Sequence, residues 1–246
     1  MTSAQGDRRA DLGRALEALR RRIAQACDAA GRSGAEIELI AVTKTRPADD
    51  VALLVDLGLE RFGENRPQEA ESKVHELRRL RPDAGAHWHL VGRLQRNKAR
   101  AVARWASRVE SVDSVRLVDA LDRAALAALD EGSREARLRV LLQVSLDGDP
   151  DRGGALPEHL RELAERVGAA EGLELDGLMA VAPRTADPDA AFDALAKHAA
   201  RLREAFPGAS VVSAGMSGDL ERAIKYGSTC LRVGTALLGD RRLASP

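Results

Sequence analysis

Glu36-Ile-Glu-Leu-Ile-Ala-Val42 is the first of eight short segments whose order along the chain decides the fold. Its β-branched and mostly apolar residues are typical of a strand that is buried on both faces. Before it, apolar side chains recur at helical spacing from about Arg8 to Ala30, and Gly31 ends this predicted helix. The chain therefore begins with one helix and enters a buried sheet at about residue 36.

Seven further segments are predicted to be strands, and amphipathic segments with helical spacing separate them. The predicted strands are Arg61–Gly63, Trp88–Val91, Arg108–Val112, Arg139–Ser145, Leu175–Met179, Ser210–Ser213 and Cys230–Val233. The predicted helices are Pro47–Leu57, Pro67–Leu80, Leu94–Ala106, Val115–Leu129, Pro157–Ala169, Pro188–Ala205 and Gly218–Tyr226. Strands that alternate with helices in this way favour an α/β fold, a single (β/α)8 TIM barrel with an extra N-terminal helix. An open doubly wound sheet is the alternative.

Nothing in the sequence divides the chain into separate domains. Neither a linker-like nor a low-complexity stretch occurs between the predicted elements. We therefore expect residues 1–246 to form one barrel domain. Its predicted parts are an N-terminal helix and connector at 1–35, the barrel at 36–239 and a tail at 240–246.

The composition excludes several classes of function. Lys and Arg together number 38, as do Asp and Glu, and this zero net charge argues against binding to nucleic acid or to an anionic membrane. The aromatic residues (two Trp, one Tyr, three Phe) are too few for a base-stacking surface. Cys27 and Cys230 lie far apart and form no CxxC pair, so neither a disulfide framework nor a zinc site is predicted. Residues 1–11 lack the apolar segment of a secretory signal, and a cytoplasmic protein is expected.

Lysine is the rarer of the two basic residues, with five among 38, and one of the five stands out by its position. Lys44 closely follows the first buried strand, and the carboxyl ends of barrel strands are where active sites assemble. Partial burial there would disfavour the charged ammonium, which suits a Schiff-base lysine. A solvated lysine at a strand end is the alternative. The remaining four occupy predicted helices or polar segments and look ordinary: Lys73, Lys98, Lys197 and Lys225.

Glycine-rich turns after the last two predicted strands point to a phosphate site. Ser213-Ala-Gly-Met-Ser-Gly-Asp219 joins the seventh strand to a helix, and we expect Ser217 to cap that helix and to leave amides free for an anion. After the eighth strand, Gly234 lets the backbone approach a ligand closely, and Thr235 adds a hydroxyl. Barrel phosphate sites often form from these two loops, although tight turns alone would also explain the glycines.

Two further groups of polar residues are ambiguous. His87 and His89 share one face of a predicted strand, as metal ligands can, but no third ligand is evident in the sequence. A role in packing or in orienting a ligand is therefore expected. Gly63-Glu64-Asn65 places polar residues at the end of the second strand, where a site at the barrel rim and an ordinary turn are equally compatible with the sequence.

Taken together, these stretches resemble the YggS/PROSC family of pyridoxal-phosphate homeostasis proteins. The matching stretches run in order along the chain: Ile40–Thr45, Phe62–Asn65 with Gln68-Glu69, Trp88–Gly92 with Leu94-Gln95 and Asn97-Lys98, Gly177–Ala180, Gly215–Ser217 with Asp219, Ala223-Ile224, Gly227–Thr229, and Arg232–Thr235 with Gly239. One departure occurs beside them. The family usually has Tyr after the Gly-Glu-Asn triplet, whereas this chain has Arg66-Pro67, which leaves the role of that part of the rim open.

The resemblance implies a barrel similar to the N-terminal domain of alanine racemase, the fold-type III arrangement of proteins that bind pyridoxal 5'-phosphate (PLP). It implies that Lys44 holds PLP as a Schiff base and that Arg232 faces the pyridine nitrogen. The residues implied to bind the phosphate are Ser217, Gly234 and Thr235. The residues implied to line the pocket are Asn65, His89 and Met216.

The same resemblance implies a carrier that buffers PLP in the cell, binds other B6 vitamers and passes PLP to PLP-dependent apoenzymes. An amino-acid racemase of the alanine racemase type is the alternative. Racemisation needs a base on each face of the substrate carbon, and racemases with this barrel take a tyrosine from an added C-terminal β-domain. This chain ends at Pro246, and its one tyrosine, Tyr226, is predicted near the end of the last helix.

Arg232 favours the carrier as well. A guanidinium stays protonated, so it would leave the pyridine nitrogen unprotonated and make the ring a weaker electron sink. We therefore expect little or no catalytic turnover, no bound metal and, without the interface that a β-domain provides, a monomer.

Overall fold

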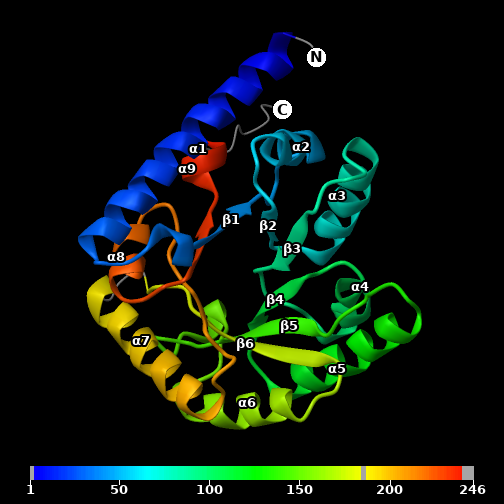
Figure 1. Ribbon diagram of the computed structural model, residues 1–246. Helices are drawn as coiled ribbons and strands as arrows, with labels where there is room; N and C mark the ends of the chain where they lie inside the picture. Colours follow the sequence, from blue (N-terminus) through cyan, green and yellow to red (C-terminus); the bar gives the residue numbers. More distant parts are fainter. Residues whose placement is uncertain (1–2, 184–186, 240–246) are drawn as a thin grey trace.

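Eight parallel strands pair side by side in sequence order, and the pairing of β1 with β8 closes them into a barrel (Figure 1). The computed structural model describes residues 3–183 and 187–239. The strands are β1 Glu38–Val42, β2 Arg61–Glu64, β3 His87–Leu90, β4 Arg108–Val112, β5 Leu138–Gln143, β6 Leu173–Met179, β7 Val211–Ser213 and β8 Cys230–Val233. Each predicted strand is present, with its ends shifted by at most two residues. The predicted (β/α)8 barrel is confirmed.

Helices cover the outside of the barrel (Figure 1). Those between strands are α2 Ala48–Asp56, α3 Pro67–Leu80, α4 Ala99–Ala103, α5 Val115–Asp130, α6 Leu160–Gly168, α7 Pro188–Ala205 and α8 Leu220–Lys225. Two predicted helices are shorter than expected, because 3-10 turns at Arg96–Lys98 and Pro157–His159 precede α4 and α6. The short helix after β8, α9 Thr235–Leu238, is absent from the prediction, since four residues are too few to show a helical period.

The first helix, α1 Ser3–Ala29, lies across the outside of the barrel and packs on α8 and α9 (Figure 1). Its buried apolar stripe consists of Leu12, Leu16, Leu19, Ile23 and Ala26. Arginines on this side also reach main-chain carbonyls. Arg22 donates to the Ser217 oxygen at 3.2 Å, and Arg32, just after the helix, donates to the Ser228 oxygen at 2.7 Å. The N-terminal helix therefore supports the loops on both sides of α8.

The assignment of the whole chain to one domain stays a prediction. The barrel occupies the range predicted for it, whereas the tail predicted at 240–246 lies outside the described residues. Among the helices that the structure describes, none is long and apolar enough to cross a membrane.

Gly177 in β6 marks a close approach of two strands. Its φ is 150°, and a Cβ at this position would lie 1.9 Å from the carbonyl oxygen of Val211 in β7. A methyl group in that place would overlap the oxygen, so β6 and β7 could keep their pairing only by moving apart. The closed barrel therefore requires glycine here.

We expect Gly177→Ala to destabilise the protein by at least about 2 kcal/mol, because both the backbone conformation and the available space oppose a side chain. Urea unfolding followed by circular dichroism measures the change. Gly208→Ala is the matched control, since a Cβ there meets no atom within 4 Å, and its effect should stay within about 0.5 kcal/mol. Equal stability of the two variants would contradict the close approach of β6 and β7.

Candidate functional site

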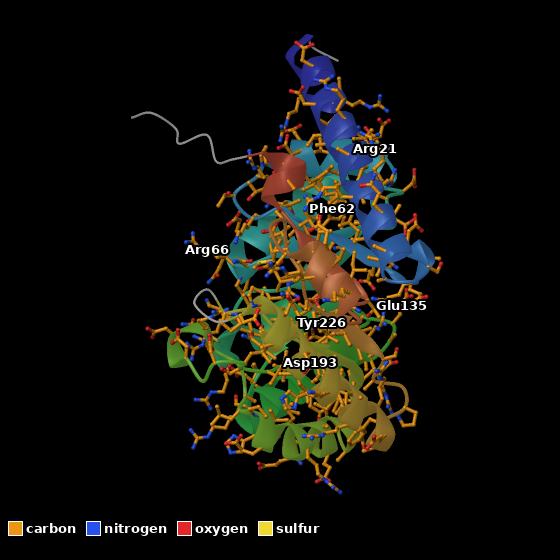
Figure 2. The ribbon with its side chains drawn as sticks, turned by 90° about the vertical axis from the view of Figure 1, so that its left-hand side faces the viewer. Arg21, Phe62, Arg66, Glu135, Asp193 and Tyr226 are labelled. Carbon is orange, nitrogen blue, oxygen red and sulfur yellow. The ribbon has the colours of Figure 1, made fainter. Side chains whose placement is uncertain are left out.

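The loops that follow the strands gather at one end of the barrel, here named the rim. Arg66, which follows β2, and Glu135, which precedes β5, lie on opposite sides of the molecule in Figure 2. Because all the strands are parallel, the loops after β1, β2, β7 and β8 meet at the rim. The predicted site residues in these loops are Lys44, Asn65, Met216, Ser217, Gly234 and Thr235. The other two, Arg232 and His89, lie within β8 and β3.

Lys44 stands on a tight turn directly after β1. The Arg46 N–H donates to the Thr43 oxygen at 3.0 Å, and Thr45, between them, has a φ of 64°. No other non-glycine residue in the described part of the chain has a positive φ. The turn carries the Lys44 side chain into solvent, so the expected partial burial is wrong. Within residues 3–183 and 187–239, the Lys44 ammonium has neither a hydrogen bond nor an ion pair.

A buried lysine that the sequence does not reveal lies beneath this turn. Lys73 Nζ donates to the Thr43 oxygen at 2.8 Å and to Glu64 Oε1 at 2.5 Å. Only 5% of its side chain is exposed, so the prediction of an ordinary helix lysine is wrong. One signal for this pair was present, because Glu64 ends a buried strand and a buried carboxylate needs a cation nearby.

The turn is also held through carboxylates. Burial raises the pKa of the Glu64 carboxyl, and the Lys73 ammonium opposes that rise. The Thr43 hydroxyl donates to Glu64 Oε1 at 2.6 Å. On the other side of Lys44 in the same turn, the Thr45 N–H donates to Glu69 Oε1 at 2.6 Å. Both residues that flank Lys44 therefore bond to groups on β2 and α3.

One hydrogen bond joins the loops after β7 and β8. The Ala236 N–H donates to Ser217 Oγ at 3.1 Å, so Ser217 links the β7 loop to the first turn of α9. The expectation that Ser217 caps the helix after β7 is wrong. That helix, α8, begins two residues later than predicted, and Asp219 occupies its N-cap position. Asp219 Oδ1 instead accepts from the Met216 N–H at 2.6 Å.

These two loops bring together a set of residues that is here named the anion site: Ser217, Gly218, Gly234 and Thr235. Within the described residues, the N–H groups of Ser217, Gly218 and Thr235 have no acceptor. Ser217 Oγ accepts from Ala236 but keeps its own proton to donate. A Cβ on Gly234 would lie 3.3 Å from the Val42 oxygen, so glycine lets this loop pass close to the end of β1. Free N–H and hydroxyl donors in one place fit an anion such as a phosphate.

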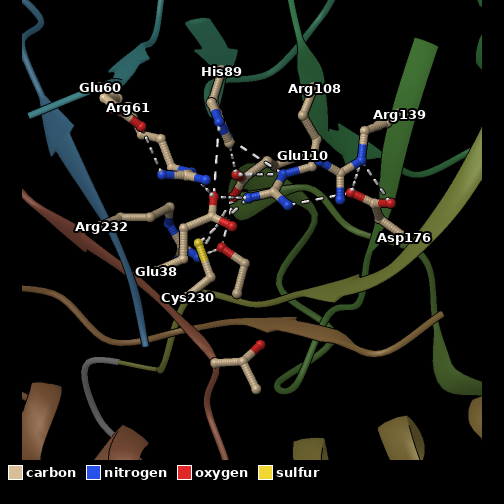
Figure 3. A network of polar contacts seen from close by, with 12 residues as sticks. Glu38, Glu60, Arg61, His89, Arg108, Glu110, Arg139, Asp176, Cys230 and Arg232 are labelled. Carbon is tan, nitrogen blue, oxygen red and sulfur yellow. Dashed lines mark hydrogen bonds and ion pairs between the residues drawn. The ribbon is translucent and has the colours of Figure 1, made fainter. Parts of the chain in front are cut away.

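Arg232 points from β8 into the barrel, where its guanidinium is fixed. Nη1 donates to Ser213 Oγ at 2.6 Å, and Nη2 donates to the Ala180 oxygen at 2.8 Å. The residue is 5% exposed. Because Ala180 directly follows β6, the guanidinium lies at the rim end of the barrel interior. Arg232 thereby joins a network of buried charges to the rim (Figure 3).

Glu110 is the centre of this network. Its Oε1 lies 2.9 Å from His89 Nδ1, and its Oε2 accepts from the Ser213 hydroxyl at 2.6 Å. Desolvation would raise the pKa of this fully buried carboxyl, but the hydrogen bond with His89 and the charge of Arg108 lower it to about 2. Desolvation lowers the pKa of His89, and the hydrogen bond with Glu110 opposes that shift. Glu110 is therefore a buried carboxylate with a donor on each oxygen.

Arg108 extends the network away from the rim. Its guanidinium contacts Glu38 and lies 3.2 Å from Asp176 (Figure 3). Burial disfavours the charge of Arg108, yet the surrounding carboxylates outweigh that cost and raise its pKa. The sequence signal for this network was the alternation of Arg108 and Glu110 in one strand, which places both side chains on the inner face. The ring of His89 lies in this network, and its assignment to a cofactor pocket stays a prediction.

The remaining predicted residues lie at the rim surface. Asn65 is half-buried at the edge of an open cavity of about 1100 Å³, which Arg66 and Lys98 also line. The Met216 side chain is exposed. The strand order places the residues in one arc of the rim: Met216 and Ser217 after β7, Gly234 and Thr235 after β8, Lys44 after β1 and Asn65 after β2. Within the described parts of the chain, no group of three His, Cys, Asp or Glu residues could hold a metal ion.

Residues 15–242 match the family model described as alanine racemase, N-terminal domain. The chain is 55% identical to the pyridoxal phosphate homeostasis protein of Mycobacterium tuberculosis, over 99% of this chain and 98% of that protein. The chain belongs to the pyridoxal phosphate homeostasis protein family. A member of this family from Escherichia coli is 35% identical, over 94% of this chain and 97% of its own length. The resemblance seen in the sequence is confirmed.

Solved structures extend the comparison from the family to the fold. PipY from Synechococcus elongatus, with PLP bound, is 33% identical with a TM-score of 0.78, and the match covers 93% of this chain and all of PipY. Alanine racemase from Corynebacterium glutamicum is 17% identical with a TM-score of 0.62, and the match covers 94% of this chain and 62% of the racemase. This second likeness shows the fold alone. Members of the pyridoxal phosphate homeostasis protein family thus share their barrel with racemases.

We expect acid unfolding of this family member to depend on Glu110. The pKa of about 2 lies below the ordinary value of 4.5, so the ionised carboxylate stabilises the fold at neutral pH by about 3 kcal/mol. This contribution is lost as the pH falls from about 4.5 through about 2. Glu110→Gln should therefore lower the free energy of unfolding at pH 7 and flatten its decline in acid, measured by urea unfolding at a series of pH values.

Glu162→Gln is the control for this prediction. Glu162 is exposed on α6 and has no partner within the described residues, so its replacement should leave both the stability and its pH dependence unchanged. If Glu110→Gln kept the full acid-induced loss of stability, the assignment of that loss to Glu110 would be wrong.

Proposed function

We propose that this protein binds PLP at the rim, holds it covalently on Lys44 and serves as an intracellular carrier that buffers free PLP. The observation that carries the proposal is the Lys44 amine after β1, which has no hydrogen bond or ion pair with any described residue and lies between Asn65 and the anion site in the order of the strands. The relatives support it, because they are named pyridoxal phosphate homeostasis proteins and the PipY structure has PLP bound.

The residues of the arc fit the parts of this cofactor. Bound PLP supplies an aldehyde, whose condensation with an amine forms a C=N bond and releases water. The exposed Lys44 amine is accessible for that bond. We assign the phosphate to Ser217, Gly234 and Thr235 of the anion site, whose free donors complement its negative charge. We assign the wall of the pocket to Asn65, His89 and Met216.

A role without catalytic turnover is favoured by two residues. We assign Arg232 to the pyridine nitrogen. A guanidinium remains protonated and donates hydrogen bonds, so the ring nitrogen stays unprotonated and the ring withdraws electrons weakly. Tyr226, the one tyrosine of the sequence, directly follows α8 and precedes β8, at the end of the barrel opposite to Lys44. In this position it cannot act as a second base for racemisation at Lys44.

The proposed carrier acts as a cytoplasmic monomer. Its proposed partners are PLP-dependent apoenzymes, which would receive the cofactor, and other B6 vitamers that carry a phosphate for the anion site. Arg66-Pro67 replaces the tyrosine that is usual in the family, and both residues line the open cavity beside Asn65. The surface next to the proposed cofactor is therefore positively charged at this point.

Incubation with PLP should give a yellow protein, and borohydride reduction should fix the cofactor to the peptide that contains Lys44. Peptide mapping by mass spectrometry measures the position of the label. Lys44→Ala should lose the label, because the amine that forms the bond is gone. Lys197→Ala, which removes an exposed lysine of α7, should be labelled as the original protein is. Label on a different lysine would overturn the assignment.

Incubation of the PLP-loaded protein with L-alanine should give negligible D-alanine, because we assign Arg232 to the ring nitrogen and the one tyrosine of the sequence, Tyr226, lies at the opposite end of the barrel. Chiral chromatography measures the product, with an authentic alanine racemase as positive control. Turnover at about 1 s⁻¹ or faster, the range of ordinary enzymes, would show that the protein is a racemase and not a carrier.

A further inference from the structure

Lys73 is the one buried lysine among the residues that the structure describes. It belongs to α3, yet its ammonium lies beneath the turn that carries Lys44, between the Thr43 oxygen at 2.8 Å and Glu64 Oε1 at 2.5 Å. A buried ammonium loses its hydration, and its partners compensate for that loss only when they are held in good geometry. Lys73 therefore ties the carboxyl ends of β1 and β2 to the same helix.

A second residue of α3 holds the other side of the turn. Glu69 Oε1 accepts from the Thr45 N–H at 2.6 Å and lies 3.5 Å from Lys73 Nζ. Thr45 has the left-handed backbone conformation, which is unfavourable for a β-branched residue and persists only where neighbours fix it. The acceptor on Glu69 supplies such a constraint.

The two contacts bracket Lys44. Thr43, before it, is held by Lys73, and Thr45, after it, is held by Glu69. Lys44 itself has no partner within the described residues, so its direction depends on the backbone of the turn and not on contacts of its own side chain. A reaction between an amine and a bound aldehyde depends steeply on the position of the amine. A displacement of about 1 Å can slow such a step about a hundredfold.

We propose that Lys73, acting with Glu69, is a positioning residue that fixes the turn on both sides of Lys44 and so directs its amine at the proposed cofactor. This inference rests on the proposed attachment of PLP to Lys44. A purely structural role predicts a different result. Loss of the Lys73 ammonium leaves the Glu64 carboxylate buried without its cation, which destabilises the fold and would weaken the binding of any ligand at the rim, whether or not that ligand can bond to Lys44. The two roles therefore separate when covalent and non-covalent binding are measured independently.

The test compares PLP with pyridoxine 5'-phosphate, which has the same ring and phosphate but an alcohol in place of the aldehyde. Lys73→Met keeps most of the side-chain volume and removes the ammonium. We expect its affinity for pyridoxine 5'-phosphate to stay within about twofold of the original, whereas the rate of borohydride-trapped labelling at Lys44 falls about tenfold or more. Lys197→Met, the control on α7, should change neither quantity.

Glu69 provides a second test that does not depend on the folding of the Lys73 variant. Its side chain is 28% exposed, so Glu69→Ala should melt at nearly the original temperature without cofactor. Glu69→Ala removes the acceptor of the Thr45 N–H and should slow labelling at Lys44 several-fold. Glu69→Gln keeps an oxygen in that place and should restore most of the rate. Glu76→Ala, on the exposed face of the same helix, should label at the original rate.

Several outcomes decide the matter. Labelling at the original rate in both Lys73→Met and Glu69→Ala would overturn the inference. An equal loss of binding of PLP and of pyridoxine 5'-phosphate in Lys73→Met would also overturn it, because that result indicates a collapsed pocket. If Lys73→Met does not fold, identical labelling rates of Glu69→Ala and Glu69→Gln overturn it. Failure of the original protein to be labelled at Lys44 would instead refute the proposed function, and this inference with it.

Discussion

The buried carboxylate of Glu110 sets the arrangement of the barrel interior. A closed barrel of eight strands leaves a space that side chains must fill, and in this protein charged groups fill part of it. An ionised carboxylate at that depth is tolerated only when donors satisfy its oxygens. His89 and Ser213 supply them, while Arg108 balances the charge from the other side. The positions of these side chains are therefore consequences of one charge.

This constraint reaches the rim through a short chain of contacts. Ser213 bonds both to Glu110 and to Arg232, and Arg232 continues to the Ala180 oxygen at the end of β6. The guanidinium is thus placed by the barrel interior and not by a loop. The anion site is fixed differently, by the bond between Ser217 and Ala236 and by the support of α1. Two parts of the rim that are held by hydrogen bonds therefore flank a lysine that has no hydrogen bond or ion pair within the described residues.

The sequence was sufficient to predict the features that follow from the order of strands and helices along the chain, such as the end of the barrel at which a loop lies. Parallel strands that alternate with helices all end on one side, so Lys44 and Ser217 could be assigned to the rim before their surroundings were known. Pairings across elements could not be predicted in this way. Lys73 was predicted to be an ordinary lysine on a helix, because its partner Glu64 comes from a strand, outside the helical pattern. The acceptor at Ser217 serves α9, a helix too short to have a period. The exposure of Lys44 depends on the turn at Thr45, whose left-handed conformation is uncommon for threonine.

The fold alone does not separate a carrier from an enzyme, because alanine racemase has the same barrel at 17% identity. The proposed distinction rests on the group that we assign to the ring nitrogen. Arg232 lies 4.0 Å from Glu110 and bonds to the serine that satisfies the same carboxylate. Replacement of this guanidinium by a group that protonates the ring would remove a balancing charge from Glu110 and the donor that Arg232 supplies to Ser213 Oγ. The residue that weakens the proposed cofactor as an electron sink is thus also part of the balance of charges inside the barrel. On the proposed assignment, a change of this residue toward carbanion chemistry would also disturb the contacts of Ser213 and Glu110 inside the barrel.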